Sequence, residues 1–332
     1  MPVPRAEHLP PAPSVPSVPP APSAPLTVAT ALPDDRPWAR PVLVVGQGLI
    51  GSAVQALLQA GGWPVAGVRR QPAGPTDGRS HDLATAAGRA GLRAAIAEIR
   101  PRIIVLAHGP SDATWIEEHE QAAAAVHCGV AEVAAGSGIP ALMVSTDEVF
   151  PGTRGGCRAS DPVAPGSARG RVKARAEELI MAGSGLVLRV SPVYGWPGRR
   201  RGSTFASRCL IAAARGLPML VPADQMFTPV HISDVAAVIA AICALPAPLT
   251  GIRHLAGPRE LSRHDFAALA YELAGARPGL VRPCRREHTR WAGRPAFASL
   301  ECGDFSDVAG LAGWRPLSAQ GGLSMMLAAA GE

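Results

Sequence analysis

The residues best suited to chemistry lie in the decapeptide VLVVGQGLIG at positions 42–51. Four aliphatic residues lead into a glycine-rich turn, and the helix-compatible run SAVQALLQA follows it directly. Gly46 permits a tight turn, Gly48 lets backbone N–H groups approach a phosphate, and Gly51 lets the helix pack closely on the strand. A phosphate would then lie at the positive end of the helix dipole. The pattern predicts a dinucleotide site rather than an ordinary strand-to-helix turn, with the turn formed by Gly46, Gln47, Gly48, Leu49, Ile50 and Gly51.

The end of the second expected strand bears on which dinucleotide would bind. A site for NAD(H) carries Asp or Glu about 20 residues after the glycine turn, where it binds the ribose hydroxyls. This chain has Arg69 and Arg70 there, at the end of PVAGVRR (64–70). Two guanidinium groups suit a 2′-phosphate, whereas a carboxylate would repel one. The sequence therefore favours NADP(H) over NAD(H), and the alternative is two surface arginines after a strand.

Apolar segments and the helical stretches between them would position these residues. The expected strands cover 42–46, 64–70, 102–109, 141–150 and 185–195, and helical patterns cover 84–99 and 117–138. Strands without polar alternation that are separated by helices are typical of a parallel sheet covered on both faces. Beyond Trp196 the pattern loosens into shorter elements. We therefore expect an α/β protein with a doubly wound parallel sheet and a smaller C-terminal lobe.

Composition describes a globular chain with a distinct N-terminal segment. Residues 1–38 are rich in Pro, Ala and Ser, and such a segment buries too little apolar surface to offset its chain entropy, so we expect a disordered tail. Aromatic residues make up 4% of the chain and no recognition module is present, so we expect no nucleic-acid binding. No apolar run approaches the roughly 20 residues of a membrane span, so we expect no membrane insertion.

The six cysteines are scattered, and none has the spacing of a metal ligand set, so no metal site is expected. The N-terminus lacks the apolar core of a secretory signal. We therefore expect reduced thiols and a cytoplasmic location.

Further motifs follow one another in a recognisable order. They are STDEVF (145–150), DPVAPGSARGRVKARAEE (161–178), LRVSPVYG (188–195), PADQMFTPVHISDVA (222–236) and HLAGPRELSRHDFA (254–267). This succession resembles the extended short-chain dehydrogenase/reductases, and most of all their dTDP-4-dehydrorhamnose reductase branch. The resemblance covers the chain from Pro41 to its end. It implies an NADP-binding Rossmann domain over 39–195 and a mainly substrate-binding lobe over 196–332, with part of 225–256 returning to the Rossmann domain.

The resemblance also implies roles for residues near the expected cofactor. Thr146 would hydrogen-bond a substrate carbonyl, and Lys173 would hold the nicotinamide ribose. Ala107 and His108 follow the strand expected under the nicotinamide and would contact the cofactor. The family's tyrosine, four residues before the lysine, is replaced by Arg169. That tyrosine donates a proton as hydride reaches the carbonyl carbon, and an arginine with a pKa above about 12 is a very poor donor near neutral pH.

Arg169 leaves two readings open. It stands four residues before Lys173 on one expected helix face, so two cations would point at the site. Arg169 would then bind an anionic group or stabilise the developing oxyanion. Alternatively, it faces solvent in a family member that has lost its activity. His108, His127 and Glu148 are the candidates to supply the missing proton, the histidines because their reference pKa is about 6.5.

Other departures from the family gather around the expected substrate, and together they argue against a thymidine-diphosphate sugar. The residues at which we expect substrate contacts are Trp115, His127, Asp147, Glu148, Pro192 and Tyr194.

Three functions fit this sequence. The first is an NADPH-dependent reductase of a carbonyl or imine on a small polar substrate of anionic or sugar-like character. The second is a catalytically silent NADP(H)-binding or regulatory protein. The third is a redox-neutral epimerase or dehydratase, a class that also relies on the missing tyrosine. We adopt the first hypothesis, with a small-molecule substrate and, by analogy with relatives, a homodimer.

Overall fold

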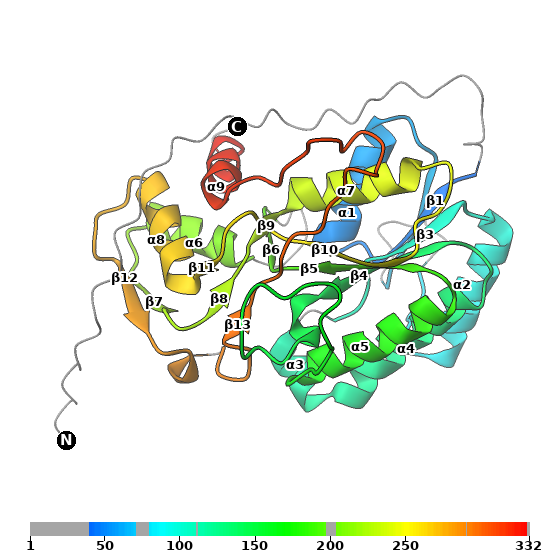
Figure 1. Ribbon diagram of the computed structural model, residues 1–332, viewed down its shortest axis with the longest axis horizontal. Coiled ribbons are helices and arrows are strands. Elements are labelled where there is room, and N and C mark those ends of the chain that lie inside the picture. The colour runs from blue at the N-terminus through cyan, green and yellow to red at the C-terminus, as the bar shows by residue number, and fades with distance from the viewer. Residues whose placement is uncertain (1–39, 71–79, 111, 197–203, 290, 331–332) are drawn as a thin grey trace.

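The computed structural model describes residues 40–70, 80–110, 112–196, 204–289 and 291–330. The tail expected over 1–38 lies outside these described residues. Within them, helices form layers around one large sheet, and a second group of elements lies beside it (Figure 1).

A six-stranded parallel sheet forms the centre of the fold. Its strands lie in the order β10-β5-β4-β3-β1-β2, and every neighbouring pair is parallel. All residues of β1 and β3 are buried, because helices cover both faces of the sheet. The strands are β1 (Val42–Val45), β2 (Val65–Val68), β3 (Ile103–Leu106), β4 (Ala141–Thr146), β5 (Leu186–Val190) and β10 (Gly251–Leu255).

Helices pack on the sheet in two layers. One face is covered by α1 (Leu49–Ala60) and α7 (Ile232–Ala244), and the other by α2 (Ala86–Ile99), α4 (Glu120–Ala135) and α5 (Ala168–Ala182), as Figure 1 shows. Val54 of α1 and Val238 of α7 share one hydrophobic cluster with β1. Leu92 of α2 and Ile180 of α5 belong to a second cluster on the opposite face. This is the doubly wound α/β arrangement predicted from the sequence.

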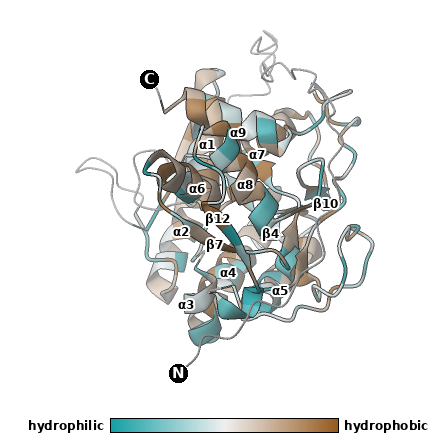
Figure 2. Cartoon of the chain, turned by 90° about the vertical axis from the view of Figure 1, so that its left-hand side faces the viewer, coloured by the Kyte–Doolittle hydropathy of each residue, from teal (hydrophilic) through white to brown (hydrophobic). Residues whose placement is uncertain are grey.

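The C-terminal elements gather around their own hydrophobic cluster, which includes Phe227, Phe266 and Tyr271. Figure 2 shows hydrophobic colouring on α6 here, in contrast to the hydrophilic colouring along α5. The elements are β6 (Val193–Tyr194) paired with β9 (Val230–His231), β7 (Met219–Pro222) paired with β12 (Val281–Cys284), β8 (Met226–Phe227) between β11 (Leu261–Ser262) and β13 (Phe297–Ala298), and α6 (Phe205–Ala214), α8 (Arg263–Leu273), η2 (Arg286–His288) and α9 (Ala319–Ala328).

Three expected elements differ from the structure by more than shortened ends. The strand expected over 141–150 ends at Thr146, and Asp147–Val149 form a 3-10 turn, η1. The strand expected over 185–195 ends at Val190 and resumes as β6 after Pro192, because proline has no N–H to donate to a ladder. The helix expected over 117–138 is two helices, α3 (Ala113–Glu118) and α4, which meet at His119.

A buried ion pair fixes α5 against the sheet. Arg189 of β5 and Glu177 of α5 are 1% and 4% exposed, and their closest atoms, Arg189 Nη2 and Glu177 Oε2, are 2.7 Å apart. Arg189 Nε also donates to both carboxylate oxygens, at 3.1 Å. Ser145 Oγ of β4 donates to the same carboxylate. Because α5 also carries Arg169 and Lys173, this network sets where those side chains lie.

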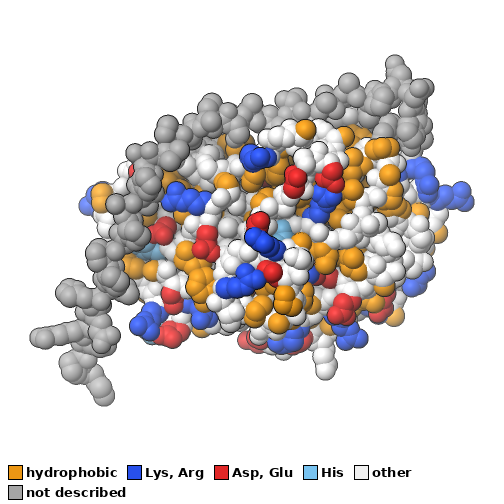
Figure 3. Space-filling view, viewed as in Figure 1, with side chains coloured by type: hydrophobic (Ala, Val, Ile, Leu, Met, Phe, Trp, Pro, Cys, Tyr) orange, Lys and Arg blue, Asp and Glu red, His pale blue; other side chains and the backbone are white. Residues whose placement is uncertain are grey.

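Three further features of the described residues concern the classes of function. On the face drawn in Figure 3, acidic and basic side chains are interspersed. No helix among the described residues is both long and apolar enough to cross a membrane. All six cysteines are described, and none forms a disulfide.

Candidate functional site

The glycine turn after β1 is held by close backbone contacts. Gly46 has φ +92°, and its N–H donates to the Val68 carbonyl at 2.8 Å, which ties the turn to the end of β2. A Cβ on Gly46 would lie 2.5 Å from the Cα of His108. A Cβ on Gly51 would lie 1.9 Å from the Gly46 carbonyl oxygen, so α1 starts directly against the turn. Glycine is therefore required at both positions for packing.

Gly48 differs from these two glycines because it faces open space. A Cβ built on it meets no atom within 4 Å, and the residue is exposed. Gly48 is also the N-cap of α1, and among the described residues no side chain caps that helix. The first backbone N–H groups of a helix have no partner within the helix, so they can bind an anion here. These features fit the pyrophosphate of a dinucleotide.

The side chain of Gln47 does not occupy the open space at Gly48. Its Nε2 donates to Gln55 Oε1 at 2.7 Å, and it lies against Gly67 of β2, where a Cβ would be 2.0 Å from Gln47 Nε2. The side chain therefore fills the gap between the turn and β2. Leu49 and Ile50 are half-buried at the start of α1, so what these residues offer a ligand is their backbone.

Arg69 and Arg70 follow β2 directly and lie beside the glycine turn. Val68 pairs with Val45 in the sheet, so the ends of β1 and β2 are neighbours. Arg69 is half-buried and its carbonyl accepts a hydrogen bond from the His81 N–H, whereas Arg70 is exposed. Residues 71–79, which follow, lie outside the described residues.

Thr146 is the last residue of β4, at the carboxyl ends of the strands, where parallel α/β proteins bind their ligands. Its Oγ1 donates to Asp147 Oδ1 at 2.8 Å and accepts from the Glu148 N–H at 3.3 Å. Asp147 Oδ2 is buried and has no hydrogen-bond partner among the described residues. Burial, reinforced by the charge of Glu148, raises the pKa of Asp147 to about 7. This carboxyl can therefore carry a proton near neutral pH.

Arg169 is engaged by a neighbouring carboxylate. Its Nη1 lies 3.1 Å from Glu148 Oε1, while Ser167 Oγ donates to Glu148 Oε2 at 3.0 Å. Glu148 is 4% exposed, so this ion pair is largely removed from water. The expectation of two cations directed at the site is therefore corrected, since the Arg169 charge is offset by Glu148. Both carboxyl oxygens of Glu148 are therefore engaged, one by Arg169 and the other by Ser167.

Lys173 lies one helical turn after Arg169 and is 8% exposed. Its Nζ donates to the Val144 carbonyl of β4 at 3.0 Å. Burial, followed by the nearby charge of Arg169, lowers the pKa of Lys173 to about 7, while Glu177 acts in the opposite direction. We call Thr146, Asp147, Glu148, Arg169 and Lys173 the Thr146 group.

His108 and His127 form a buried pair close enough to Lys173 for its charge to act on both rings. Their ring centroids are 5.4 Å apart, and Gly109, with φ +103°, leaves room for the His127 ring. None of the four ring nitrogens makes a hydrogen bond of normal geometry within the described residues, although the carbonyls of Val126 and Pro110 favour protonation slightly. Burial and the charge of Lys173 lower the pKa of His108 to about 3, and that of His127 well below its usual value. Both rings are neutral at pH 7, so neither is a proton donor.

Arg263 is a charged residue near the site that sequence reasoning missed. It begins α8 in the C-terminal elements, is 4% exposed, and its guanidinium carbon lies 4.0 Å from the centroid of the Phe227 ring. Its Nε donates to Gln225 Oε1 at 3.3 Å. The charge of Arg263 acts on Asp147 and Glu148. No local signal marks it, because the motif LSRHD reads only as a helix cap.

Three other residues were expected to contact the substrate, and their surroundings differ. Trp115 is 38% exposed and stacks on His119, with ring centroids 4.7 Å apart. Tyr194 is buried in the C-terminal cluster, and its hydroxyl donates to the Ser318 carbonyl at 3.5 Å. Pro192 is half-buried, and its carbonyl accepts from the Val230 N–H. The Tyr194 side chain is therefore used by the fold itself.

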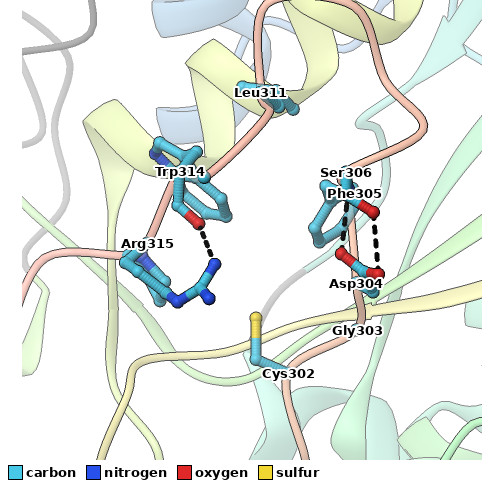
Figure 4. Close-up of a pocket in the computed structure, with 10 residues that line it drawn as sticks. Cys302, Gly303, Asp304, Phe305, Ser306, Leu311, Trp314 and Arg315 are labelled. Atoms are coloured by element: carbon cyan, nitrogen blue, oxygen red, sulfur yellow. Dashed lines mark hydrogen bonds between the residues drawn. The ribbon is translucent and has the colours of Figure 1, made fainter.

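A cavity of about 320 Å³ is lined by the C-terminal segment 302–316. Figure 4 shows Trp314 and Arg315 on one side of it and Asp304, Phe305 and Ser306 on the other, where Asp304 accepts hydrogen bonds from Ser306. Its lining includes no residue of the glycine turn or of the Thr146 group. The cavity is therefore separate from the candidate reaction site.

Comparison with known proteins places the chain in a family. The family model described as the RmlD substrate binding domain matches residues 40–320. A probable dTDP-4,6-dihydroxy-2-methyloxan-3-one 4-ketoreductase of Streptomyces antibioticus is 33% identical over 229 residues, which are 66% of this chain and 76% of the relative. Methionine adenosyltransferase 2 subunit beta of Bos taurus is 24% identical over 273 residues, 79% of this chain and 80% of the relative.

Solved structures agree on the fold. The dTDP-4-dehydrorhamnose reductase of Bacillus anthracis, determined in complex with NADP, matches with a TM-score of 0.73 at 21% identity, over 87% of this chain and 99% of that chain. Because the family model spans most of the residues from Arg40 onward, the conclusion does not rest on fold alone. This chain belongs to the RmlD substrate-binding domain family.

Proposed function

We propose that this protein is an NADPH-dependent reductase of a carbonyl group on a nucleotide-activated sugar. The observation that carries the proposal is the open, uncapped N-terminus of α1 at Gly48, beside the arginines that follow β2. The 33% identity with a Streptomyces antibioticus 4-ketoreductase supports the substrate class. It favours a nucleotide sugar, which the departures around the site had argued against.

Each part of the cofactor has residues that suit it. The backbone N–H groups at the start of α1 would bind the pyrophosphate. Arg69 and Arg70 would bind a 2′-phosphate. Lys173 would exchange its hydrogen bond to the Val144 carbonyl for the hydroxyls of the nicotinamide ribose. When bound, NADPH supplies a hydride equivalent.

The substrate carbonyl would lie beside Thr146. Its oxygen is held 2.8 Å from Asp147 Oδ1, so the position of the hydroxyl group is fixed before the substrate arrives. Arg169 is held by Glu148 and is partly exposed, and its guanidinium can stabilise negative charge that develops on the carbonyl oxygen. The neutral rings of His108 and His127 add uncharged groups near Lys173.

The test is NADPH oxidation by the purified protein, followed by absorbance. The ketone for which the Streptomyces antibioticus relative is named, dTDP-4,6-dihydroxy-2-methyloxan-3-one, serves as the probe. We expect turnover that is lost in Lys173→Ala, with the product alcohol confirmed by mass spectrometry. NADPH binding without oxidation, across this ketone and related 4-keto sugar nucleotides, would contradict the proposal.

A second candidate is an NADP(H)-binding regulatory subunit without catalysis. Two observations favour it: the family's tyrosine is absent, and one relative is named as the beta subunit of methionine adenosyltransferase 2. On this candidate NADPH raises the thermal stability by linkage, but no substrate accelerates its oxidation. Turnover by the wild-type protein would exclude it. The cytoplasmic location and the homodimer stay predictions.

A further inference from the structure

Carbonyl reduction needs a proton as well as a hydride. When the carbonyl carbon accepts hydride, its oxygen becomes an alkoxide that must be protonated. An arginine guanidinium, such as that of Arg169, is a very poor proton donor near neutral pH. Another group close to Thr146 must therefore supply the proton.

We propose that Asp147 supplies this proton through the hydroxyl of Thr146. The inference rests on the reductase function proposed above. Thr146 Oγ1 and Asp147 Oδ1 are 2.8 Å apart, a distance across which a proton can pass in either direction. Asp147 Oδ2 is buried and without a hydrogen-bond partner among the described residues. The two residues are adjacent in the chain and held by the end of β4 and by η1, so the relay is part of the fold.

The other titratable groups near Thr146 are less suitable. His108 and His127 are neutral at pH 7, because burial and the charge of Lys173 lower their pKa values. Glu148 has both carboxyl oxygens engaged, one by Arg169 and the other by Ser167, and its side chain makes no hydrogen bond to Thr146 among the described residues. Lys173 directs its ammonium to the Val144 carbonyl and is assigned to the ribose. Asp147 alone among these groups has a proton to give and a direct hydrogen bond to Thr146.

The step balances in atoms and charge. The carbonyl carbon gains hydride from the reduced cofactor, which is left oxidised. The Thr146 hydroxyl, which donates to Asp147 Oδ1 in the structure, turns toward the alkoxide oxygen and passes its proton there, which forms the new O–H bond. The Asp147 carboxyl proton passes to Thr146 Oγ1, so Asp147 is left as a carboxylate. Solvent then reprotonates Asp147 before the next turnover.

Charges around Asp147 keep it protonated to near neutral pH. Burial is the largest effect, and Glu148 raises the pKa further. Arg169 and Arg263 act in the opposite direction, as does the hydrogen bond from Thr146. The resulting pKa of about 7 suits a proton donor that must be reloaded from water. Hence kcat should fall as the pH rises through about 7, because the acid form of Asp147 is lost.

The test compares Asp147→Asn with the wild-type protein, using NADPH and the same 4-keto nucleotide sugar. We expect kcat to fall by about 10²- to 10⁴-fold, the usual contribution of a general acid, while the Kd for NADPH stays unchanged. The part of the decline above pH 7 that is due to Asp147 should disappear in the variant, whereas any part that is due to Lys173, whose pKa is also about 7, should remain. The matched control is Asp307→Asn, which alters an exposed ion pair with Arg253.

A rescue separates proton supply from a merely structural role. Arg169→Tyr places the family's proton donor on α5, so the double variant Asp147→Asn/Arg169→Tyr should recover at least tenfold of the lost kcat. If Asp147→Asn does not fold, Thr146→Val breaks the same relay at its other end, and Thr146→Ser should keep it. Infrared difference spectra provide a readout apart from activity: a protonated carboxyl band should titrate near pH 7 and vanish without Asp147.

The outcomes distinguish this inference from the reductase proposal. Wild-type turnover with an unchanged kcat and pH profile in Asp147→Asn would overturn the relay and leave the reductase in place. An absence of wild-type turnover, with NADPH bound, would overturn both. Loss of kcat in Asp147→Asn together with rescue by Arg169→Tyr supports the relay.

Discussion

The glycine turn allows packing and ligand binding to be separated by two substitutions. Gly51→Ala would place a methyl group 1.9 Å from the carbonyl oxygen of Gly46, which is backbone and cannot rotate away. Gly48→Ala would place a methyl group in open space, with no atom within 4 Å. The first change should therefore damage the fold, and the second should damage only the binding of a phosphate.

The magnitudes follow from these contacts. Overpacking of this kind costs about 1–3 kcal/mol, and alanine returns about 1 kcal/mol over glycine inside a helix. Because the clash is with backbone, we expect Gly51→Ala to lower the free energy of unfolding by about 2 kcal/mol. For Gly48→Ala, alanine is the poorer N-cap by about 0.5–1 kcal/mol, and the less flexible unfolded chain offsets about as much. Its free energy of unfolding should stay within about 0.5 kcal/mol of wild type.

The assays are urea unfolding for stability and calorimetric titration for NADPH. Gly48→Ala should weaken NADPH binding at least tenfold, or about 1.4 kcal/mol, because its methyl occupies the path of the pyrophosphate. Gly48→Ser is the matched comparison, since it adds an N-cap hydroxyl as well as bulk. If Gly48→Ala binds NADPH as tightly as wild type, the phosphates do not pass this glycine and the cofactor assignment is wrong.

Three more predictions concern the surroundings of the site. Glu177→Ala should lower the free energy of unfolding by about 3–5 kcal/mol in urea, because it leaves the buried Arg189 charge unpaired; a loss below 1 kcal/mol would contradict this. Gly109→Ala should also destabilise, since its Cβ would lie 2.1 Å from His127 Cε1. Adding His127→Ala should recover the part of the lost free energy of unfolding that is due to the clash, but not the part due to the strain at φ +103°. If the losses in the double variant are purely additive, the contact between Gly109 and His127 is refuted. Arg70→Ala should raise the Kd for NADPH about tenfold and leave that for NADH unchanged, and equal changes for both would argue against recognition of the 2′-phosphate.

Local pattern was enough to predict most of the central sheet. The strands from β1 to β5 are short apolar runs bounded by turns, and the glycine turn has its own spacing. β10 is harder to recognise, because Arg253 and His254 interrupt its apolar sequence. His254 is nevertheless buried, next to Arg189 of β5. Its environment depends on a residue 65 positions away, which local periodicity does not report.

The state of the candidate site depended on contacts that no motif encodes. Glu148 and Arg169 lie 21 positions apart in the sequence. Because they form an ion pair, the charge of Arg169, which was expected to be unpaired, is balanced by the Glu148 side chain. The depth of burial of His108 and His127 decides that they are neutral, and burial follows from packing of whole helices. Arg263 reaches the site from the C-terminal elements, so only the folded arrangement connects it with Asp147.

The central claim is that this protein transfers hydride from NADPH to a substrate carbonyl. The most direct measurement uses NADPH with deuterium at both positions of the nicotinamide C4 and dTDP-4,6-dihydroxy-2-methyloxan-3-one, followed by mass spectrometry of the sugar product. We expect one deuterium on the new carbinol carbon for each NADPH oxidised. A protein that binds the labelled NADPH and leaves both the label and the ketone unchanged would contradict it.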